Sequence, residues 1–236
     1  MMGNLYLIPT TLGESETARV IPSDVAAIVK EIKYFIVENI RTTRRYLRKL
    51  DPQLNIDELV FFELNQHTES HLMEEFLKPV IEGFDVGIIS EAGCPGVADP
   101  GAEVVKLAHL KHIRVIPLVG PSSILLSLMA SGMNGQNFAF IGYIPVKPIE
   151  RVKAIRDIEK RSAMEKQTQI FIETPYRNTA LMNDLITTLS DQTRLCVASD
   201  ITLATEYIKT QTIAQWKNSI PDLNKRPTIF LIQKDY

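Results

Sequence analysis

The chain has 236 residues, of which 45% are hydrophobic and 23% are charged, and its formal net charge is −2 at pH 7. This length is enough for one large domain or two small ones, and the composition is typical of a soluble globular protein. The slightly acidic balance argues against a surface dominated by affinity for nucleic acid, although it leaves room for a local basic patch.

The cysteines and the apolar segments bear on the compartment. Cys94 and Cys196 are far apart and form no C-x-x-C pair, so we expect two reduced thiols in a cytosolic protein. The apolar stretch near the N-terminus is too short for a secretory leader, and no segment approaches the ~20 apolar residues that span a membrane. We therefore expect a cytoplasmic protein with no membrane segment.

The first half of the chain alternates predicted strands with predicted helices. Short apolar runs indicate the strands, and apolar residues at helical spacing indicate the helices. Such alternation is typical of a parallel, doubly wound α/β sheet. In chain order we expect a strand at residues 4–9, a helix at 22–32, a strand at 34–37, a basic helix at 41–50, a strand at 59–63, a helix at 71–82 closed by Gly83, a strand at 86–89, a helix at 102–112 and a strand at 113–118.

The second half shows a different pattern of predicted elements, with strands before and after one long charged helix in the sequence. We therefore place a domain boundary near Leu118, which gives α/β domains at residues 1–117 and 118–236. A cleft between two domains is a preferred position for a ligand. The expected elements are a helix at residues 124–131, a strand at 138–141, a helix at 149–166, a strand at 169–173, a helix at 179–189, a mixed segment at 201–218 and strands at 194–198 and 228–233.

Residues 88–101, IISEAGCPGVADPG, are the most informative segment of the chain. A buried strand stops there in a run of small residues, whose glycines let a ligand approach the backbone and whose prolines keep the loop stiff. A long rigid loop at the carboxyl end of a parallel strand is where open α/β sheets bind ligands. A second turn, VGPSS at residues 119–123, opens directly into a helix, where backbone N–H groups suit an acceptor.

Several charged residues near strand ends are candidates for chemistry, each with a structural alternative. Asp99 either caps the helix that follows it or lies at the mouth of a ligand site. Arg41 follows Glu38 at the end of a strand; it either binds a phosphate or carboxylate or is one of the solvated charges of its helix. Arg177 is either a surface cation or a site residue at the end of a buried strand.

The common signatures of metal, nucleotide and serine hydrolase sites are missing from the sequence. His67 and His71 stand four residues apart, but no third metal ligand lies nearby. The sequence has no G-x-S-x-G, no Walker A motif and no G-x-G-x-x-G after the first strand. We therefore expect no bound metal, and a ligand that is held by other loops.

Five motifs in order resemble the tetrapyrrole methylase superfamily of S-adenosylmethionine-dependent methyltransferases. The closest likeness is to its branch of ribosomal-RNA 2′-O-ribose methyltransferases, which act on the small-subunit RNA. The matching segments cover most of the chain: LYLIPTTLG at residues 5–13, SEAGCPGVADPG at 90–101, GPSS at 120–123, GYIP at 142–145 and ETPYR at 173–177.

The resemblance implies two α/β domains with S-adenosylmethionine in the cleft between them, and a homodimer that acts on ribosomal RNA or the small ribosomal subunit. A ribose hydroxyl is a weak nucleophile that benefits from a general base. Our hypothesis is that Asp99 or Glu38 lies beside the acceptor and that Arg41 steers a phosphate. The cofactor contacts implied by the resemblance are Pro9, Gly93, Cys94, Val97, Ser122, Ser123, Ile124, Thr174, Pro175, Ala198 and Pro227.

The chain departs from the branch at several motif positions. An acidic residue of the family is Asn39 here, and the family's C-terminal extension has no expected counterpart; the other changes are Glu14, Glu91, Cys94 and Tyr176. Two alternatives therefore stay open, namely methylation of a small molecule such as a tetrapyrrole and a binding protein that kept the fold without catalysis. A basic rim around the site, with the arginines at residues 41–48 as candidates, would favour RNA.

Overall fold

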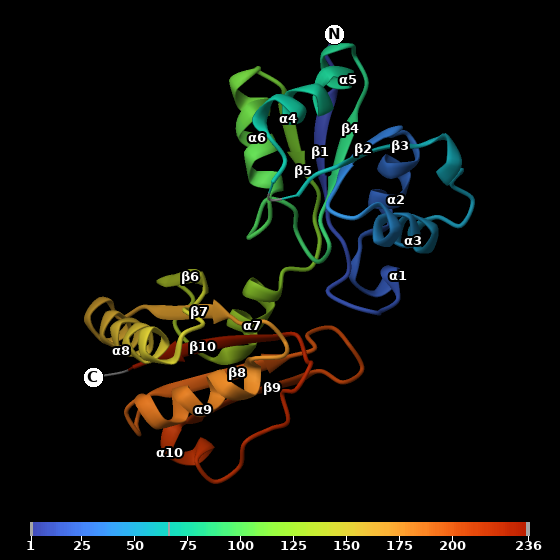
Figure 1. Cartoon of the computed structure of the whole chain (residues 1–236). Coiled ribbons are helices and arrows are strands. Elements are labelled where there is room, and N and C mark those ends of the chain that lie inside the picture. Colours follow the sequence, from blue (N-terminus) through green and yellow to red (C-terminus); the bar gives the residue numbers. More distant parts are fainter. Residues whose placement is uncertain (1, 66, 235–236) are drawn as a thin grey trace. The chain divides into compact units, whose positions relative to one another are not determined.

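The computed structural model describes residues 2–65 and 67–234. The chain divides into two compact units, Met1–Ser122 and Ser123–Tyr236, which we call unit 1 and unit 2 (Figure 1). The division falls after the boundary expected near Leu118, because the turn that follows β5 still packs on unit 1. Leu118 donates its N–H to Leu7 O at 2.9 Å, and Cys94 Sγ lies 3.5 Å from Pro121 O.

Unit 1 contains one sheet of five parallel strands in the order β3-β2-β4-β1-β5. All these strands pair in parallel, which confirms the expected parallel sheet. Along the sequence the strands alternate with helices. The strands are β1 (Asn4–Ile8), β2 (Tyr34–Val37), β3 (Val60–Glu63), β4 (Val86–Ile89) and β5 (Arg114–Pro117). The helices are α1 (Thr17–Val20), α2 (Ser23–Lys30), α3 (Ile40–Leu50), α4 (Ser70–Phe76), α5 (Lys78–Ile81) and α6 (Gly101–Leu110), with a 3₁₀ turn η1 (Ile56–Glu58).

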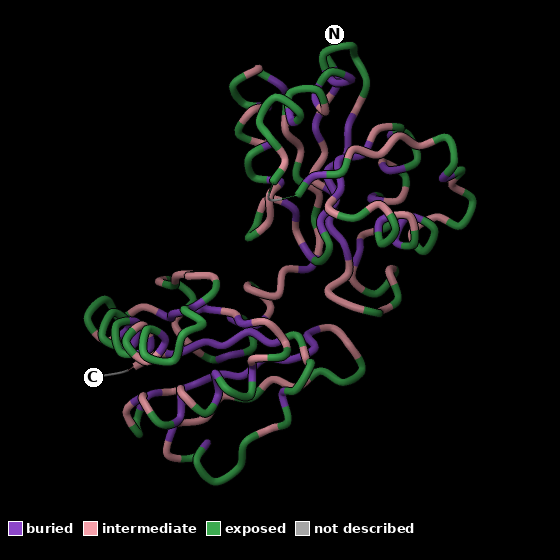
Figure 2. The backbone as a smooth tube through the Cα atoms, in the orientation of Figure 1, coloured by how far each residue is buried: buried purple, intermediate pink, exposed green. Residues whose placement is uncertain are grey.

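Both faces of this sheet are buried, which explains why its strands read as unbroken apolar runs. Alternate residues of each strand enter different cores: Ile88 packs toward α4, α5 and α6, whereas Ile89 packs toward α2, α3 and η1. Strand β4, at the centre of the sheet, is accordingly buried along its whole length (Figure 2). The sheet is therefore doubly wound, with helices on each side.

One expected helix of unit 1 is wrong. Residues 71–82 form two helices, α4 and α5, which meet at Leu77. Pro79 lies in the first turn of α5, where its missing N–H costs nothing, but the same ring would disrupt the interior of a continuous helix. Gly83 then takes a positive φ of 100° after the helix, as its expected closing role requires.

Unit 2 contains a mixed sheet in the order β6-β7-β10-β8-β9, in which only β6 and β7 pair in parallel. Helices α8, α9 and α10 cover one face, where Phe171 stacks on Phe230 with ring centroids 5.9 Å apart, and α7 packs against β9 and β10. The elements are α7 (Ser123–Ser131), β6 (Phe138–Tyr143), α8 (Pro148–Glu165), β7 (Thr168–Ile172), α9 (Asn178–Thr188), β8 (Arg194–Ser199), β9 (Tyr207–Thr212), α10 (Ile213–Trp216) and β10 (Thr228–Gln233).

Candidate functional site

Three loops of unit 1 meet at the carboxyl edge of its parallel sheet. They follow β1, β4 and β5, which are neighbours in the sheet, so their ends lie at the same edge. Thr10 donates its N–H to Gly93 O at 2.9 Å, which joins the first loop to the second. Cys94 Sγ contacts Pro121 O at 3.5 Å, which joins the second to the third. The sequence motifs that lie far apart along the chain are thus brought together.

Glycines allow these loops to approach one another. Gly93 and Gly96 take φ angles of 74° and 80°, in the left-handed region that favours glycine. A Cβ built on Gly120 would lie 2.1 Å from Pro9 Cβ, so the turn after β5 packs directly against the residue that follows β1. Around Gly96, in contrast, the space that a Cβ would fill is open.

The close approach of Gly120 to Pro9 yields a stability prediction. Gly120→Ala is expected to lower the free energy of unfolding by about 1–3 kcal/mol, because the added methyl group forces the proline ring and the turn apart. Chemical denaturation measures this change. Gly135→Ala is the control, since nothing lies within 4 Å of its added Cβ. Equal stability of the two variants would contradict the predicted clash.

Asp99 closes the loop after β4 onto the start of α6. Its two carboxylate oxygens each lie 2.9 Å from Gly96 N, and Oδ1 also accepts from Gly101 N at 2.7 Å. Burial raises the pKa of this carboxyl, although the backbone N–H groups of Gly96 and Gly101 act against the rise. Asp99 thus accepts from the first residue of α6, Gly101, and supports the start of that helix, although Pro100 occupies the N-cap position itself.

Glu38, at the end of β2, lies beside the same loop. Its Oε1 accepts from Glu91 N at 3.1 Å, and Glu91 Oε1 in turn accepts from Thr42 Oγ1 at 2.5 Å. Burial raises the pKa of Glu38; the hydrogen bond from Glu91 opposes this rise, and the neighbouring charges of Asp99 and Glu91 add to it. Strand order explains the meeting, because β2 and β4 are adjacent. A carboxylate that is half-buried with a raised pKa is suited to accept a proton.

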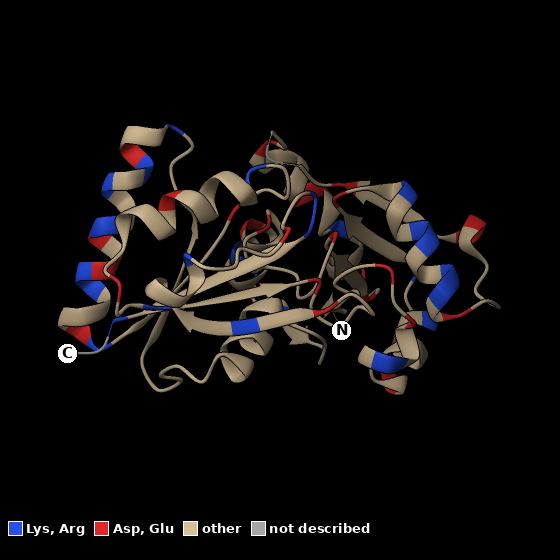
Figure 3. Ribbon diagram, turned by 90° about the horizontal axis from the view of Figure 1, so that it is seen from below, with Lys and Arg blue, Asp and Glu red and all other residues tan. Residues whose placement is uncertain are grey.

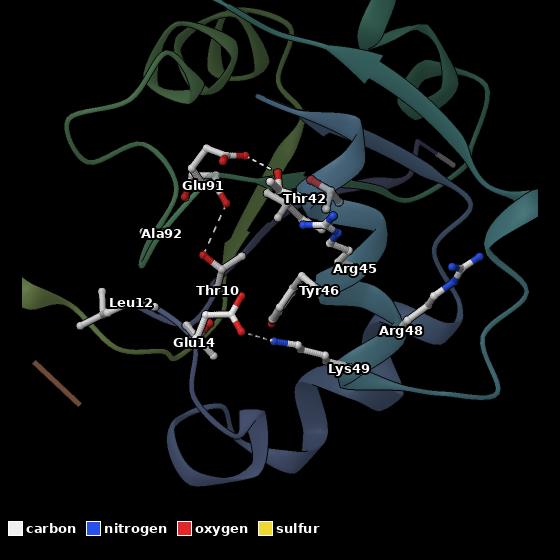
Figure 4. Close-up of a pocket in the computed structure, with 15 residues that line it drawn as sticks. Thr10, Leu12, Glu14, Thr42, Arg45, Tyr46, Arg48, Lys49, Glu91 and Ala92 are labelled. Atoms are coloured by element: carbon white, nitrogen blue, oxygen red, sulfur yellow. Dashed lines mark hydrogen bonds and ion pairs between the residues drawn. The ribbon is translucent and has the colours of Figure 1, made fainter. Parts of the chain in front are cut away.

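Beside these carboxylates the first two loops and α3 enclose a groove of about 630 Å³, within the ~300–1,000 Å³ range of ligand pockets (Figure 4). Tyr46 supports its floor by donating its hydroxyl to Pro9 O at 2.6 Å. The groove is lined by Thr10, Thr11, Leu12, Gly13, Glu14, Thr42, Thr43, Arg45, Tyr46, Arg48, Lys49, Ile89, Ser90, Glu91 and Ala92.

Of the arginines at residues 41–48 that were candidates for a basic rim, Arg45 and Arg48 line this groove, whereas its other α3 residues were not identified from the sequence. Thr42 and Lys49 are three or four residues from Arg45, a spacing that places them on one face of a helix and that could have identified them. Arg41 itself is exposed, and its N–H is bonded to Asn39 Oδ1 at 2.9 Å. Asn39 thereby caps α3, which gives a structural reason for a polar residue at the position where the family has an acid.

The predicted residues of unit 2 lie in several places within that unit. Ser123 and Ile124 begin α7, and Ala198 lies on β8. Thr174 and Pro175 follow β7, and Pro175 O accepts from Lys225 N at 3.1 Å. Pro227, two residues further, directly precedes β10. The turn after β7 and the segment before β10 are thus neighbours.

Arg177 is an ion-paired residue rather than a free surface cation. Its Nη2 lies 2.6 Å from Glu173 Oε1, which also accepts from Thr174 N at 2.6 Å. Burial of Glu173 would raise its pKa, but the hydrogen bonds from Arg177 and Thr174 outweigh this and lower it. The pair therefore stiffens the turn in which Thr174 and Pro175 stand.

Residues 2–65 and 67–234 contain neither a cluster of metal-ligating side chains nor a membrane-spanning helix. No group of three or more His, Cys, Asp or Glu side chains there is arranged to hold a metal ion. None of the helices in that part of the chain combines the length and apolar character needed to cross a bilayer.

Curated relatives match nearly the whole chain, although no family model matches it. It is 29% identical over 233 residues to ribosomal RNA small subunit methyltransferase I of Buchnera aphidicola subsp. Schizaphis graminum, covering 98% of this chain and 78% of the relative. The protein of the same name from Xylella fastidiosa is 29% identical over 231 residues, with 98% and 80% covered. That of Escherichia coli O157:H7 is 28% identical over 206 residues, with 87% and 68% covered.

Two solved structures show the same fold. The methyltransferase CobJ superposes with a TM-score of 0.65 at 20% sequence identity, covering 98% of this chain and 94% of that one. Uroporphyrin-III-C-methyltransferase from Thermus thermophilus superposes with a TM-score of 0.56 at 14% identity, covering 99% and 93%. Together with the relatives, these structures confirm the expected fold class and the resemblance to the tetrapyrrole methylase superfamily.

Proposed function

We propose that this chain is an S-adenosylmethionine-dependent methyltransferase that modifies a ribose 2′-hydroxyl in small-subunit ribosomal RNA. The observation that carries the proposal is the meeting of three motif-bearing loops beside Glu38 at the carboxyl edge of the unit 1 sheet. The names of the relatives, all ribosomal RNA small subunit methyltransferase I, support the RNA substrate.

The loops at this edge fit a cofactor that is held by backbone groups. Gly96 leaves open space where a side chain would stand, and the positive φ angles of Gly93 and Gly96 turn the peptide groups of the loop. When bound, S-adenosylmethionine supplies an electrophilic methyl group on a positively charged sulfur. The residues proposed to hold it are Pro9, Gly93, Cys94, Val97 and Ser122 of unit 1 and Ser123, Ile124, Thr174, Pro175, Ala198 and Pro227 of unit 2.

Glu38 is the residue that we propose as general base. Its Oε1 is engaged by Glu91 N, whereas within the described residues no donor is bonded to Oε2. Oε2 is therefore the atom that would take the proton of the ribose hydroxyl, which is a weak nucleophile until it is deprotonated. The hydrogen bond to Oε1 holds the carboxylate in one orientation, which aligns it with the acceptor.

Arg41 and the groove favour RNA over the alternative of a small tetrapyrrole. We propose that the exposed Arg41 guanidinium steers a phosphate toward Glu38, three residues away. The groove beside Glu91 has a basic rim of Arg45, Arg48 and Lys49, as an RNA site requires. The resemblance extends the proposal to a cytoplasmic homodimer.

Cofactor binding and ribose mapping test the proposal. Calorimetry is expected to detect binding of S-adenosylmethionine, and a strain that lacks the gene is expected to lack one 2′-O-methyl group in its small-subunit ribosomal RNA. Re-expression of the wild-type chain should restore that group. A complete methylation pattern in the strain would contradict the RNA substrate. No binding at millimolar cofactor would contradict both enzymatic functions and leave the non-catalytic binding protein.

A further inference from the structure

Helix α3 concentrates positive charge on a chain whose net charge is negative. It carries no acidic residue, and its cations are Arg41, Arg44, Arg45, Arg48 and Lys49. In Figure 3 its turns are blue without red, whereas blue and red alternate along α8. Arg41, Arg45 and Arg48 follow the spacing i, i+4, i+7, which places these three residues in one row along the helix.

The cations of α3 differ in their partners. Arg44 forms an ion pair with Asp57 on η1 and does not line the groove. Lys49 lies 3.4 Å from Glu14 Oε2, so its charge is partly balanced. Arg45 and Arg48 are exposed and are among the residues that line the groove, and no carboxylate of the described residues is within ion-pair distance of either. The Arg45 guanidinium lies beside Thr42, whereas that of Arg48 extends toward the outer side of α3 (Figure 4). These two guanidiniums are therefore available to an anion from outside the chain.

The rest of the groove suits the backbone of a polynucleotide. Thr11, on the loop after β1, also lines the groove, whereas the buried Thr10 donates its hydroxyl to Ser90 O at 3.4 Å. The groove extends from Arg48 to Glu91, which contacts Thr42 and Glu38 through hydrogen bonds. A chain with phosphates at regular intervals can use a row of guanidiniums, whereas a single small anion needs only one. The row leads toward Glu38, because Arg41, the first arginine of the row, is only three residues from Glu38 in the sequence.

We propose that Arg45 and Arg48 bind successive phosphodiester groups of a single-stranded RNA segment that lies in this groove and carries the target ribose. This inference rests on the proposed function, since it names how the same site would hold its RNA. According to this inference Arg44 does not bind the RNA, although it has the same charge and lies on the same helix.

The double variant Arg45→Ala/Arg48→Ala tests the inference against Arg44→Ala. Binding of transcribed small-subunit ribosomal RNA is measured at several salt concentrations. Each lost phosphate contact should reduce the slope of log K against log salt by about 0.7, hence by about 1.4 for the double variant. We expect at least tenfold weaker RNA binding at low salt for the double variant, and a near wild-type slope for Arg44→Ala.

Two further readouts separate this inference from the proposed function. S-adenosylmethionine should bind the double variant with the same affinity as wild type. If wild type itself binds no cofactor, that result contradicts the proposed function but not the inference that the groove binds RNA. Wild-type RNA affinity and slope in the double variant would overturn the inference even if ribose methylation is demonstrated. An equal loss of affinity for duplex DNA of the same length would overturn the assignment to single-stranded RNA.

Discussion

Glu38→Gln is expected to lower kcat for methylation of small-subunit ribosomal RNA by about 10²–10⁴-fold, the usual contribution of a general base. Glutamine keeps an acceptor for Glu91 N, so the hydrogen bond of 3.1 Å and the shape of the site can persist while the proton acceptor is lost. Cofactor affinity should therefore stay within a few-fold of wild type. Single-turnover methylation assays and calorimetry measure the two quantities separately.

The pH dependence of the reaction gives the same residue a second signature. Burial raises the pKa of Glu38 above its ordinary value of 4.5, and only the ionised form can accept a proton. The rate should rise with pH through this raised pKa, and Glu38→Gln should remove that acid limb. Because folding disfavours the carboxylate, its contribution to stability falls as the pH rises through the raised pKa. The variant should thus be no less stable than wild type near neutral pH.

Glu63→Gln is the matched control for this experiment. Glu63 ends β3, pairs in register with Val37 next to Glu38, and does not line the groove. It should keep wild-type activity and the wild-type acid limb. If Glu38→Gln and Asp99→Asn both retain wild-type turnover, neither carboxylate is the general base.

The parallel sheet of unit 1 was predictable because burial on both faces leaves a strong signal in the sequence. Strands such as Val86–Ile89 are apolar without interruption, and each is followed by turn residues. Strand β9, Tyr207–Thr212, lies within residues 201–218, a segment whose sequence predicts only mixed structure. Its residues are only half-buried, so polar and apolar side chains mix in it and no clear period appears. A strand at the edge of a sheet is identified by its neighbour, here β8, rather than by its own composition.

The sequence offers candidate residues for the site but not their arrangement. Glu38 is a candidate because it lies at the end of a strand, and Asp99 because it lies in the loop that precedes a helix. The meeting of Glu38 with Glu91 depends on the order of β2 and β4 in the sheet, which local sequence patterns do not determine. The groove along α3 likewise needs the packing of that helix on the sheet. Tertiary contacts therefore decide which of several plausible charges share one site.

Asp99→Ala is expected to lower the free energy of unfolding by about 2–3 kcal/mol and to weaken binding of S-adenosylmethionine at least tenfold. The change removes the carboxylate that accepts from Gly96 N and Gly101 N. A buried N–H group that is left without an acceptor lowers the free energy of unfolding by about 1–3 kcal/mol, and by an amount near the lower end of this range where the group is half-buried. Without the carboxylate, the loop that contains Gly93 and Cys94 loses its attachment to α6. Thermal unfolding and calorimetry measure the two effects.

Asp99→Asn distinguishes this positioning role from a role in proton transfer. An asparagine Oδ1 can still accept from both Gly96 N and Gly101 N, as Asp99 Oδ1 does, so the loop should keep its conformation and its affinity for the cofactor. Turnover should then stay within tenfold of wild type, because the proton is taken by Glu38. A loss of turnover as large as that of Glu38→Gln, with stability and cofactor affinity intact, would instead make Asp99 the base. The raised pKa of Asp99 fits either role, so the decision rests on the contrast between asparagine, which preserves the acceptor, and alanine, which removes it.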